Sequence, residues 1–165
     1  MNASQTMAGR QFIAGRRIAS GEATLLSLRA VDGEATGHRF YPASREEAAQ
    51  AAEAAQQAFA VYSQTTPQQR ARFLNAIADE LDALGEAFFA IAGQETALPL
   101  ARLQGERART SGQLRMFAGV ILRGDTFAAR IDTALADRQP LPRPDLRQYL
   151  TALGPVAVFG ASNFP

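Results

Sequence analysis

Short apolar segments separated by turn residues characterise the first quarter of the chain. The segment 11–18 places apolar residues on both sides of Gly15, as a tight β-hairpin does. Residues 26–31 alternate between apolar and polar positions, and Asp32-Gly33 follows as a turn. The pattern predicts β structure from residue 11 to residue 42.

From residue 44 onward the apolar positions recur every three or four residues, which is the period of an amphipathic helix. Two capping boxes mark helix starts, Ser44 with Glu47 and Thr66 with Gln69. The first helix has a mostly alanine face that allows close approach to a neighbour, and Gly85 interrupts the second apolar stripe. We therefore predict four helices, at residues 45–62, 68–83, 85–95 and 99–123.

The last predicted helix, 99–123, carries polar side chains within its apolar stripe. Arg107 and Thr110 fall on that stripe, and Gly124 is a typical helix stop. Because a buried guanidinium needs a partner, we expect Arg107 to pair with Glu106 or with an acid elsewhere.

The chain beyond this helix changes character twice. Residues 125–146, with prolines at alternate positions near their end, predict a long extended loop. Residues 147–153 have the pattern of an edge strand, and 156–159 are a continuous apolar strand of the buried type. Such a strand needs neighbours on both edges, and no strand–helix unit follows it, so we expect the chain to be part of a longer one.

Composition removes most of the common catalytic chemistries. The 165 residues suit one globular domain, with 47% hydrophobic and 20% charged residues. All 17 basic residues are Arg, and Cys and Lys are absent, which excludes a disulfide, a thiolate nucleophile or a Schiff-base lysine within the chain. One histidine, His38, excludes a His-rich metal site. The chain shows no signal peptide and no apolar run of ~20 residues, which favours a cytoplasmic protein.

The charged residues favour structural roles over binding roles. The net charge of +1 argues against a nucleic-acid or membrane-surface partner. His38 lies in a polar stretch and is interpreted as solvated. Gly154 and Gly160 do not make a dinucleotide-binding glycine motif. Four arginines of the last predicted helix have an acid among them and favour ion pairing over a phosphate or RNA site: Arg102, Arg107, Arg109 and Arg115.

The final twelve residues, 154–165, read Gly-Pro-Val-Ala-Val-Phe-Gly-Ala-Ser-Asn-Phe-Pro. They resemble the aldehyde dehydrogenase segment in which the first Rossmann strand ends in an Asn-Phe-Pro turn. The resemblance extends from about Phe12 and is strongest to the NADP-using branch that contains 2-oxoglutarate-semialdehyde (2,5-dioxopentanoate) dehydrogenases. The segments that resemble this branch are Glu95-Thr96-Ala97-Leu98-Pro99, Gly105-Glu106-Arg107, Arg109-Thr110, Gln113-Leu114-Arg115, Phe117-Ala118, Ile131-Asp132 and Arg143-Pro144-Asp145-Leu146.

The resemblance implies oxidation of an aldehyde to a carboxylic acid with NADP or NAD as cofactor. A Cys thiolate attacks the aldehyde, the thiohemiacetal passes hydride to the nicotinamide, and a Glu-activated water releases the acid. In the family that Cys and Glu lie downstream of the Asn-Phe-Pro turn. Asn163 matches the oxyanion donor, a side-chain amide that stabilises charge formed in the transition state. The backbone of Phe159, Gly160, Ala161 and Ser162 is expected to flank the cofactor, although the family often has Pro-Trp where Ala161-Ser162 stand.

The resemblance also implies a fold and an assembly. The fold class is α/β, with an incomplete Rossmann-type domain that is mostly helical, has an N-terminal β segment and ends in two strands. Residues 1–165 form the N-terminal part of the cofactor-binding domain, with 147–153 as an oligomerisation-arm strand and 156–159 as the first Rossmann strand. The expected partners are an aldehyde such as 2-oxoglutarate semialdehyde and further copies in a homodimer or homotetramer. A second interpretation stays open: a truncated, non-catalytic helical module for binding or assembly.

Overall fold

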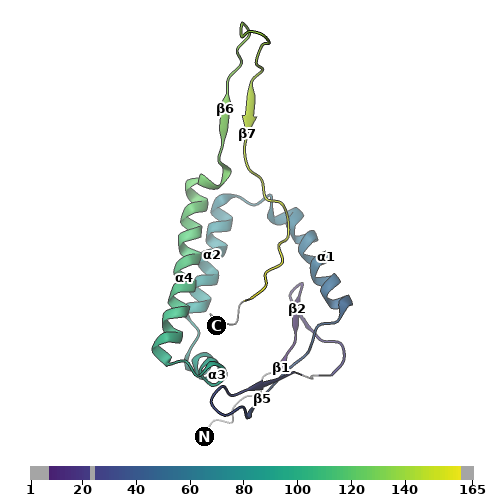
Figure 1. Ribbon diagram of the computed structural model, residues 1–165, viewed down its shortest axis with the longest axis vertical. Coiled ribbons are helices and arrows are strands. Elements are labelled where there is room, and N and C mark those ends of the chain that lie inside the picture. The colour runs from purple at the N-terminus through teal and green to yellow at the C-terminus, as the bar shows by residue number, and fades with distance from the viewer. Residues whose placement is uncertain (1–7, 23–24, 161–165) are drawn as a thin grey trace.

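The computed structural model describes residues 8–22 and 25–160, and it combines small β-sheets with four helices (Figure 1). In the first sheet, β1 (Ala8–Gly9) pairs in parallel with β5 (Ala35–Phe40), which pairs antiparallel with β4 (Leu25–Leu28). The hairpin of β2 (Gln11–Ile13) and β3 (Arg16–Ile18) turns through Ala14 and Gly15, both at positive φ. The predicted N-terminal β region is therefore confirmed.

The four helices follow in the predicted order: α1 (Arg45–Tyr62), α2 (Pro67–Asp82), α3 (Glu86–Thr96) and α4 (Leu100–Arg123). Both capping boxes form, with the Ser44 and Thr66 side chains accepting from the backbone N–H three residues later. Gly124 ends α4 at a φ of 79°, in the left-handed region that suits glycine.

The core lies mainly where α2 packs against α4, which stand side by side in Figure 1. Small residues at the contact let the two helices approach closely: Ala71 and Ala78 on α2, and Ser111 and Ala118 on α4, all 2% exposed or less. Across this contact the Arg115 guanidinium pairs with two carboxylates of α2, Asp79 at 2.6 Å and Asp82 at 2.7 Å.

The alanine face of α1 does not pack as expected. Within the described residues α1 contacts β2, and its polar side chains Gln50, Glu53 and Gln57 lie beside the β2–β3 hairpin. The alanine side, including Ala52 and Ala55, is exposed.

The prediction of a long loop at 125–146 is wrong in part, because this region forms an extended hairpin arm. After a 3₁₀ turn at Asp125–Phe127, β6 (Arg130–Asp132) pairs antiparallel with β7 (Leu146–Gln148) (Figure 1). Further along the arm, Leu135 and Arg143 exchange backbone hydrogen bonds of 2.9 and 3.0 Å. In an antiparallel pair alternate residues point their N–H groups outward, so the prolines on either side of Arg143 remove no pairing donor.

The two predicted C-terminal strands are only partly present. The first is the short β7, which ends at Gln148, and residues 149–153 have no strand. The segment 156–159 is not a strand either, and its Val156, Val158 and Phe159 are 80–94% exposed. A strand forms only beside a neighbour that pairs with its backbone, and none lies beside this segment in the described part of the chain.

Candidate functional site

The predicted catalytic and cofactor residues fall at the end of the chain. Asn163, Ala161 and Ser162 lie outside the described residues. Phe159 and Gly160 are described, and both are exposed, with Phe159 at 94%. Among the described residues no strand or helix encloses this backbone, so it does not by itself form a cradle for a dinucleotide.

The base of the segment that leads to these residues is fixed. The Leu150 N–H donates to the Phe127 carbonyl at 2.8 Å, which ties the chain after the arm to the 3₁₀ turn before it. From there the backbone runs between α1 and the α2–α4 pair (Figure 1). The arm and the helices therefore determine where the segment that leads to these residues begins.

Arg107 finds its main partners in backbone carbonyls, not in Glu106. Its Nη1 donates to the carbonyls of Leu84 at 2.9 Å and Asp82 at 3.2 Å, and its guanidinium lies over the Phe89 ring. The Asp82 carboxylate is 3.9 Å from Nε, and Nε has no hydrogen bond. Because the end of α2 leaves carbonyls without helical partners, Arg107 serves as a cap from a neighbouring helix.

Glu106 pairs instead with two arginines of its own helix, Arg102 and Arg109, at 2.8 and 2.7 Å. Although partial burial opposes ionisation, the hydrogen bonds and charges of these arginines hold the pKa of Glu106 below its usual range. The pKa of Asp82 is lowered mainly by the Arg115 side chain and then by Ser111. The expected ion pairing is thus confirmed for Arg102, Arg109 and Arg115, whereas Arg107 binds mainly backbone carbonyls.

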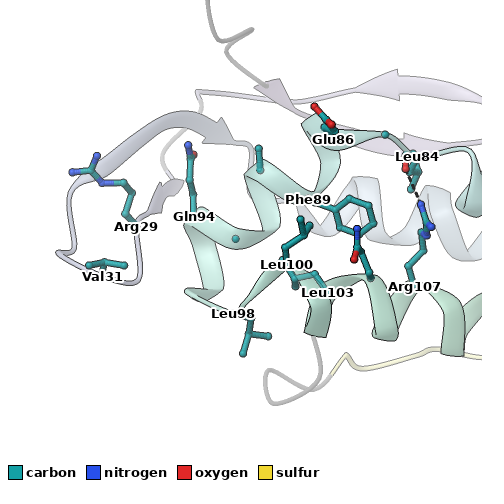
Figure 2. A pocket seen from close by; sticks show the side chains of 14 residues that line it. Arg29, Val31, Leu84, Glu86, Phe89, Gln94, Leu98, Leu100, Leu103 and Arg107 are labelled. Carbon is teal, nitrogen blue, oxygen red and sulfur yellow. Dashed lines mark hydrogen bonds between the residues drawn. The ribbon is translucent and has the colours of Figure 1, made fainter.

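An open cavity of about 800 Å³ lies beside α3, between α4 and the tip of the β4–β5 loop (Figure 2). Phe89, Leu100 and Leu103 form its apolar wall, while Arg29 and Val31 lie at the loop end. Both of its arginines are engaged elsewhere: Arg107 caps α2, and Arg29 pairs with Asp32 and Glu34. This cavity therefore has a largely apolar wall, and both of its arginines already have partners.

The prediction that His38 is solvated is wrong, because its residue is only 3% exposed on β5. The same sheet buries Ser27 of β4, whose hydroxyl donates to the Glu95 carboxylate of α3. A further hydrogen bond of 2.9 Å joins the Ala30 N–H to the Gln94 carbonyl. Buried polar groups need partners, and here they connect the β4–β5 hairpin to α3.

The described residues show neither a cluster of metal ligands nor a helix suited to cross a membrane. Residues 8–22 and 25–160 contain no cluster of three or more His, Asp or Glu side chains arranged to hold a metal ion. In the same residues none of the helices combines the length and the apolar character needed to cross a membrane.

Sequence reasoning missed contacts between segments distant in the chain. The Glu47 carboxylate caps its own helix and also accepts the Ser20 N–H at 2.8 Å. The capping box reveals the first contact, but no sequence signal reveals the second. A charged residue within an apolar stripe did identify Arg107 as partnered, although its carbonyl partners lie 23 and 25 residues away.

Comparison with known proteins identifies the class of protein. The sequence model described as the aldehyde dehydrogenase family matches residues 19–165 of this chain. The chain therefore belongs to the aldehyde dehydrogenase family. Solved structures agree on the fold: an apo betaine aldehyde dehydrogenase mutant from Staphylococcus aureus superposes with a TM-score of 0.69 at 23% identity. That match covers 81% of this chain and 26% of the other. A salicylaldehyde dehydrogenase from Pseudomonas putida G7 gives a TM-score of 0.67 at 21% identity, over 81% of this chain and 27% of that one.

Within this family, the chain is similar to two curated proteins that share one name. The alpha-ketoglutaric semialdehyde dehydrogenase of Acinetobacter baylyi is 56% identical over 157 residues, which are 95% of this chain and 30% of that protein. The alpha-ketoglutaric semialdehyde dehydrogenase 2 of Azospirillum brasilense is 47% identical over 160 residues, which are 96% and 30% of the two chains. The chain thus spans about 30% of the length of these relatives.

Proposed function

We propose that these 165 residues are the N-terminal part of an NAD(P)-dependent dehydrogenase that oxidises 2-oxoglutarate semialdehyde to the carboxylic acid. The observation that carries the proposal is the 56% identity over 157 residues to a protein named for that substrate. The cofactor class has support from a relative: a betaine aldehyde dehydrogenase from Staphylococcus aureus, 24% identical, was solved in complex with NAD+.

This chain's own contribution is positioning and charge stabilisation. The sequence contains no Cys, so the nucleophile of this reaction lies in polypeptide outside these residues. The resemblance to the family places the base Glu there as well. Asn163 donates its side-chain amide to the oxyanion that forms when the thiolate attacks, and it does so without a titrating charge. The backbone of Phe159, Gly160, Ala161 and Ser162 flanks the cofactor once 156–159 is paired as the first strand of a complete sheet.

The test is an assay of the complete protein encoded with this sequence. With 2-oxoglutarate semialdehyde, NADP+ should support formation of reduced cofactor more efficiently than NAD+, and betaine aldehyde should be a poorer substrate. A complete protein that lacks a Cys downstream, or that turns over none of these aldehydes, contradicts the proposal. The chain then stands as a non-catalytic helical module for binding or assembly.

We also propose that the complete enzyme is a cytoplasmic homo-oligomer whose contacts include residues 147–153. The hairpin arm supports this, because it extends away from the helices and exposes Ile131, Leu141 and Tyr149 at 64–71%. Exposed apolar side chains on an extended arm are typical of an interface between subunits. A homodimer or homotetramer in sedimentation velocity is the expected result, and a strictly monomeric complete enzyme contradicts it.

A further inference from the structure

A second cavity, of about 740 Å³, lies where the helices, the arm and the C-terminal segment meet. It is bounded by the end of α1, the start of α2, the end of α4, the 3₁₀ turn and residues 149–152. Because the Leu150 N–H donates to the Phe127 carbonyl, the C-terminal segment is attached to the rim of the cavity. The walls therefore come from elements held together by described contacts.

The cavity combines one cation with several hydroxyl groups. Arg70, which is partly buried, donates Nη1 to the Thr65 carbonyl in the turn between α1 and α2. Within residues 8–22 and 25–160 no carboxylate lies within ion-pair distance of Arg70. The hydroxyls of Tyr149, Thr126 and Thr151 also line the cavity, and none has a hydrogen-bond partner in those residues.

The remaining wall is apolar and partly aromatic, with Phe59, Phe127 and Ile121. A concave apolar site with a few convergent polar groups is the usual form of a small-molecule site. Arg70 keeps N–H groups that do not donate to Thr65. These groups suit a planar carboxylate, which a guanidinium binds through two parallel hydrogen bonds. A single guanidinium matches the single charge of a carboxylate, whereas a phosphate dianion would leave one charge unpaired.

We propose that this cavity binds an organic monocarboxylate with an apolar or aromatic body. The carboxylate pairs with the Arg70 guanidinium, the hydroxyl of Tyr149 donates a further hydrogen bond, and the body packs against Phe59 and Phe127. This site shares no residue with the proposed catalytic and cofactor positions, so a failure to bind naphthoate would leave the dehydrogenase proposal untouched. Residues 149–152 of its wall do lie within the segment 147–153 that is proposed for subunit contacts.

Calorimetric titration of the 165-residue chain with 2-naphthoate tests the site, with 2-naphthamide as its uncharged counterpart. Naphthoate should bind with 1:1 stoichiometry and at least about tenfold more tightly than the amide, because the amide cannot form the charged pair. Equal affinity for the two probes, or no binding of naphthoate, overturns the proposal. Inorganic phosphate alone should not compete, and full competition by phosphate would show an anion site without an apolar part.

Two variants of α2 distinguish binding of naphthoate at this cavity from nonspecific attraction of the anion to any arginine. Arg70→Gln should weaken naphthoate binding at least about tenfold, while Arg72→Gln, which alters an exposed arginine on the same helix, should change it less than twofold. Equal effects of the two variants contradict the site.

Because Arg70→Gln also removes the contact to Thr65, a steric variant provides an independent test. Ala152→Phe fills the cavity from the C-terminal segment without touching that contact. It should abolish naphthoate binding while the far-UV circular dichroism and melting temperature remain those of the unaltered chain. Naphthoate binding that survives Ala152→Phe overturns the proposal, whatever the Arg70 variant shows.

Discussion

Asn163 is a single side chain whose proposed role is confined to the chemical step. The oxyanion exists only after thiolate attack, so an amide aimed at it lowers the barrier more than it strengthens substrate binding. We expect Asn163→Ala in the complete enzyme to lower kcat roughly 10²–10³-fold and to leave cofactor affinity nearly unchanged. Single-turnover kinetics and a melting curve check this together. A variant that melts earlier but keeps full activity per folded molecule would show that Asn163 is only a turn residue.

Glu47 is a single carboxylate that joins two segments of the chain. It is 5% exposed and accepts the N–H groups of Ser44 and Ser20, both at 2.8 Å. The hydrogen bond from Ser44 is the main reason that its pKa lies below the usual value, with Ser20 adding to the effect against the cost of burial. A carboxyl whose folded pKa is lowered contributes stability above its unfolded pKa of about 4.3, and that contribution is lost as pH falls through the folded pKa.

We therefore expect Glu47→Gln to destabilise the chain at pH 7, because the two N–H groups donate to different carboxylate oxygens and the amide replaces one of these acceptors with an NH2 donor. The difference in unfolding free energy from the unaltered chain should be constant between pH 7 and about pH 5 and should shrink at lower pH. Urea unfolding at a series of pH values measures it. Glu46→Gln, at an exposed neighbouring position, is the control and should change stability little. A Glu47→Gln deficit that stays constant to pH 2 contradicts the argument.

Among whole elements, the cap that α4 provides for α2 is the contact most open to test. Removing the Arg107 guanidinium leaves two carbonyls at the end of α2 without their donor. Arg107→Met keeps most of the apolar stem, so we expect a loss of about 1–3 kcal/mol of unfolding free energy from the hydrogen bonds alone. Arg102→Met removes an exposed ion pair with Glu106 and should cost about 1 kcal/mol or less. Equal losses for the two variants would mean that the carbonyl contacts contribute nothing specific.

The helices were the most predictable elements because their signals are local. Each helix boundary lies within one residue of the sequence prediction, since capping residues and the apolar period act within a few positions of each other. The sequence predicted an arm strand at 147–153 but missed its partner strand, because Arg130 pairs with Gln148 across a long interval that no short pattern records. His38 was misjudged for the same reason: it lies on β5, which pairs with β1 and β4, and the burial of a residue in a sheet depends on strands that lie elsewhere in the sequence.

The prediction of a strand at 156–159 was wrong because a strand depends on neighbouring strands as well as on its own sequence. The apolar pattern of 156–159 indicates a buried strand, but a strand requires donors and acceptors from neighbours on its edges. In the described chain these residues are exposed and unpaired. The sequence thus predicted a strand whose neighbours are not among the described residues.

At the scale of the whole molecule, the described residues form a folded structure that leaves many apolar side chains exposed. The described residues bury few large side chains, and exposed hydrophobic residues occur along the arm, α4 and the C-terminal segment. Monomeric soluble proteins rarely leave such surfaces contiguous and uncovered. The relatives at 56% and 47% identity are about three times as long, which supports the proposal that further polypeptide covers these surfaces in the complete enzyme.

The same reasoning predicts that the purified 165-residue chain has no aldehyde dehydrogenase activity. Thiolate attack needs a Cys, and the sequence contains none. The backbone around Phe159 is open, so a dinucleotide has no cradle within the described residues. Incubation with NADP+ and 2-oxoglutarate semialdehyde should give no increase in absorbance at the wavelength of reduced cofactor above a heat-denatured control.

A complementation experiment tests the absence of activity more strictly. The part of the Acinetobacter baylyi relative that this chain does not match is added to the chain as a separate polypeptide. If the catalytic chemistry lies outside these residues and their proposed role is to position it, the mixture should gain activity that neither part has alone, and Asn163→Ala in the 165-residue part should reduce it. The mass of the purified chain must be verified first, because a trace of complete enzyme would imitate turnover. Activity of the mass-verified chain by itself would contradict the argument, since no group in it replaces the thiolate.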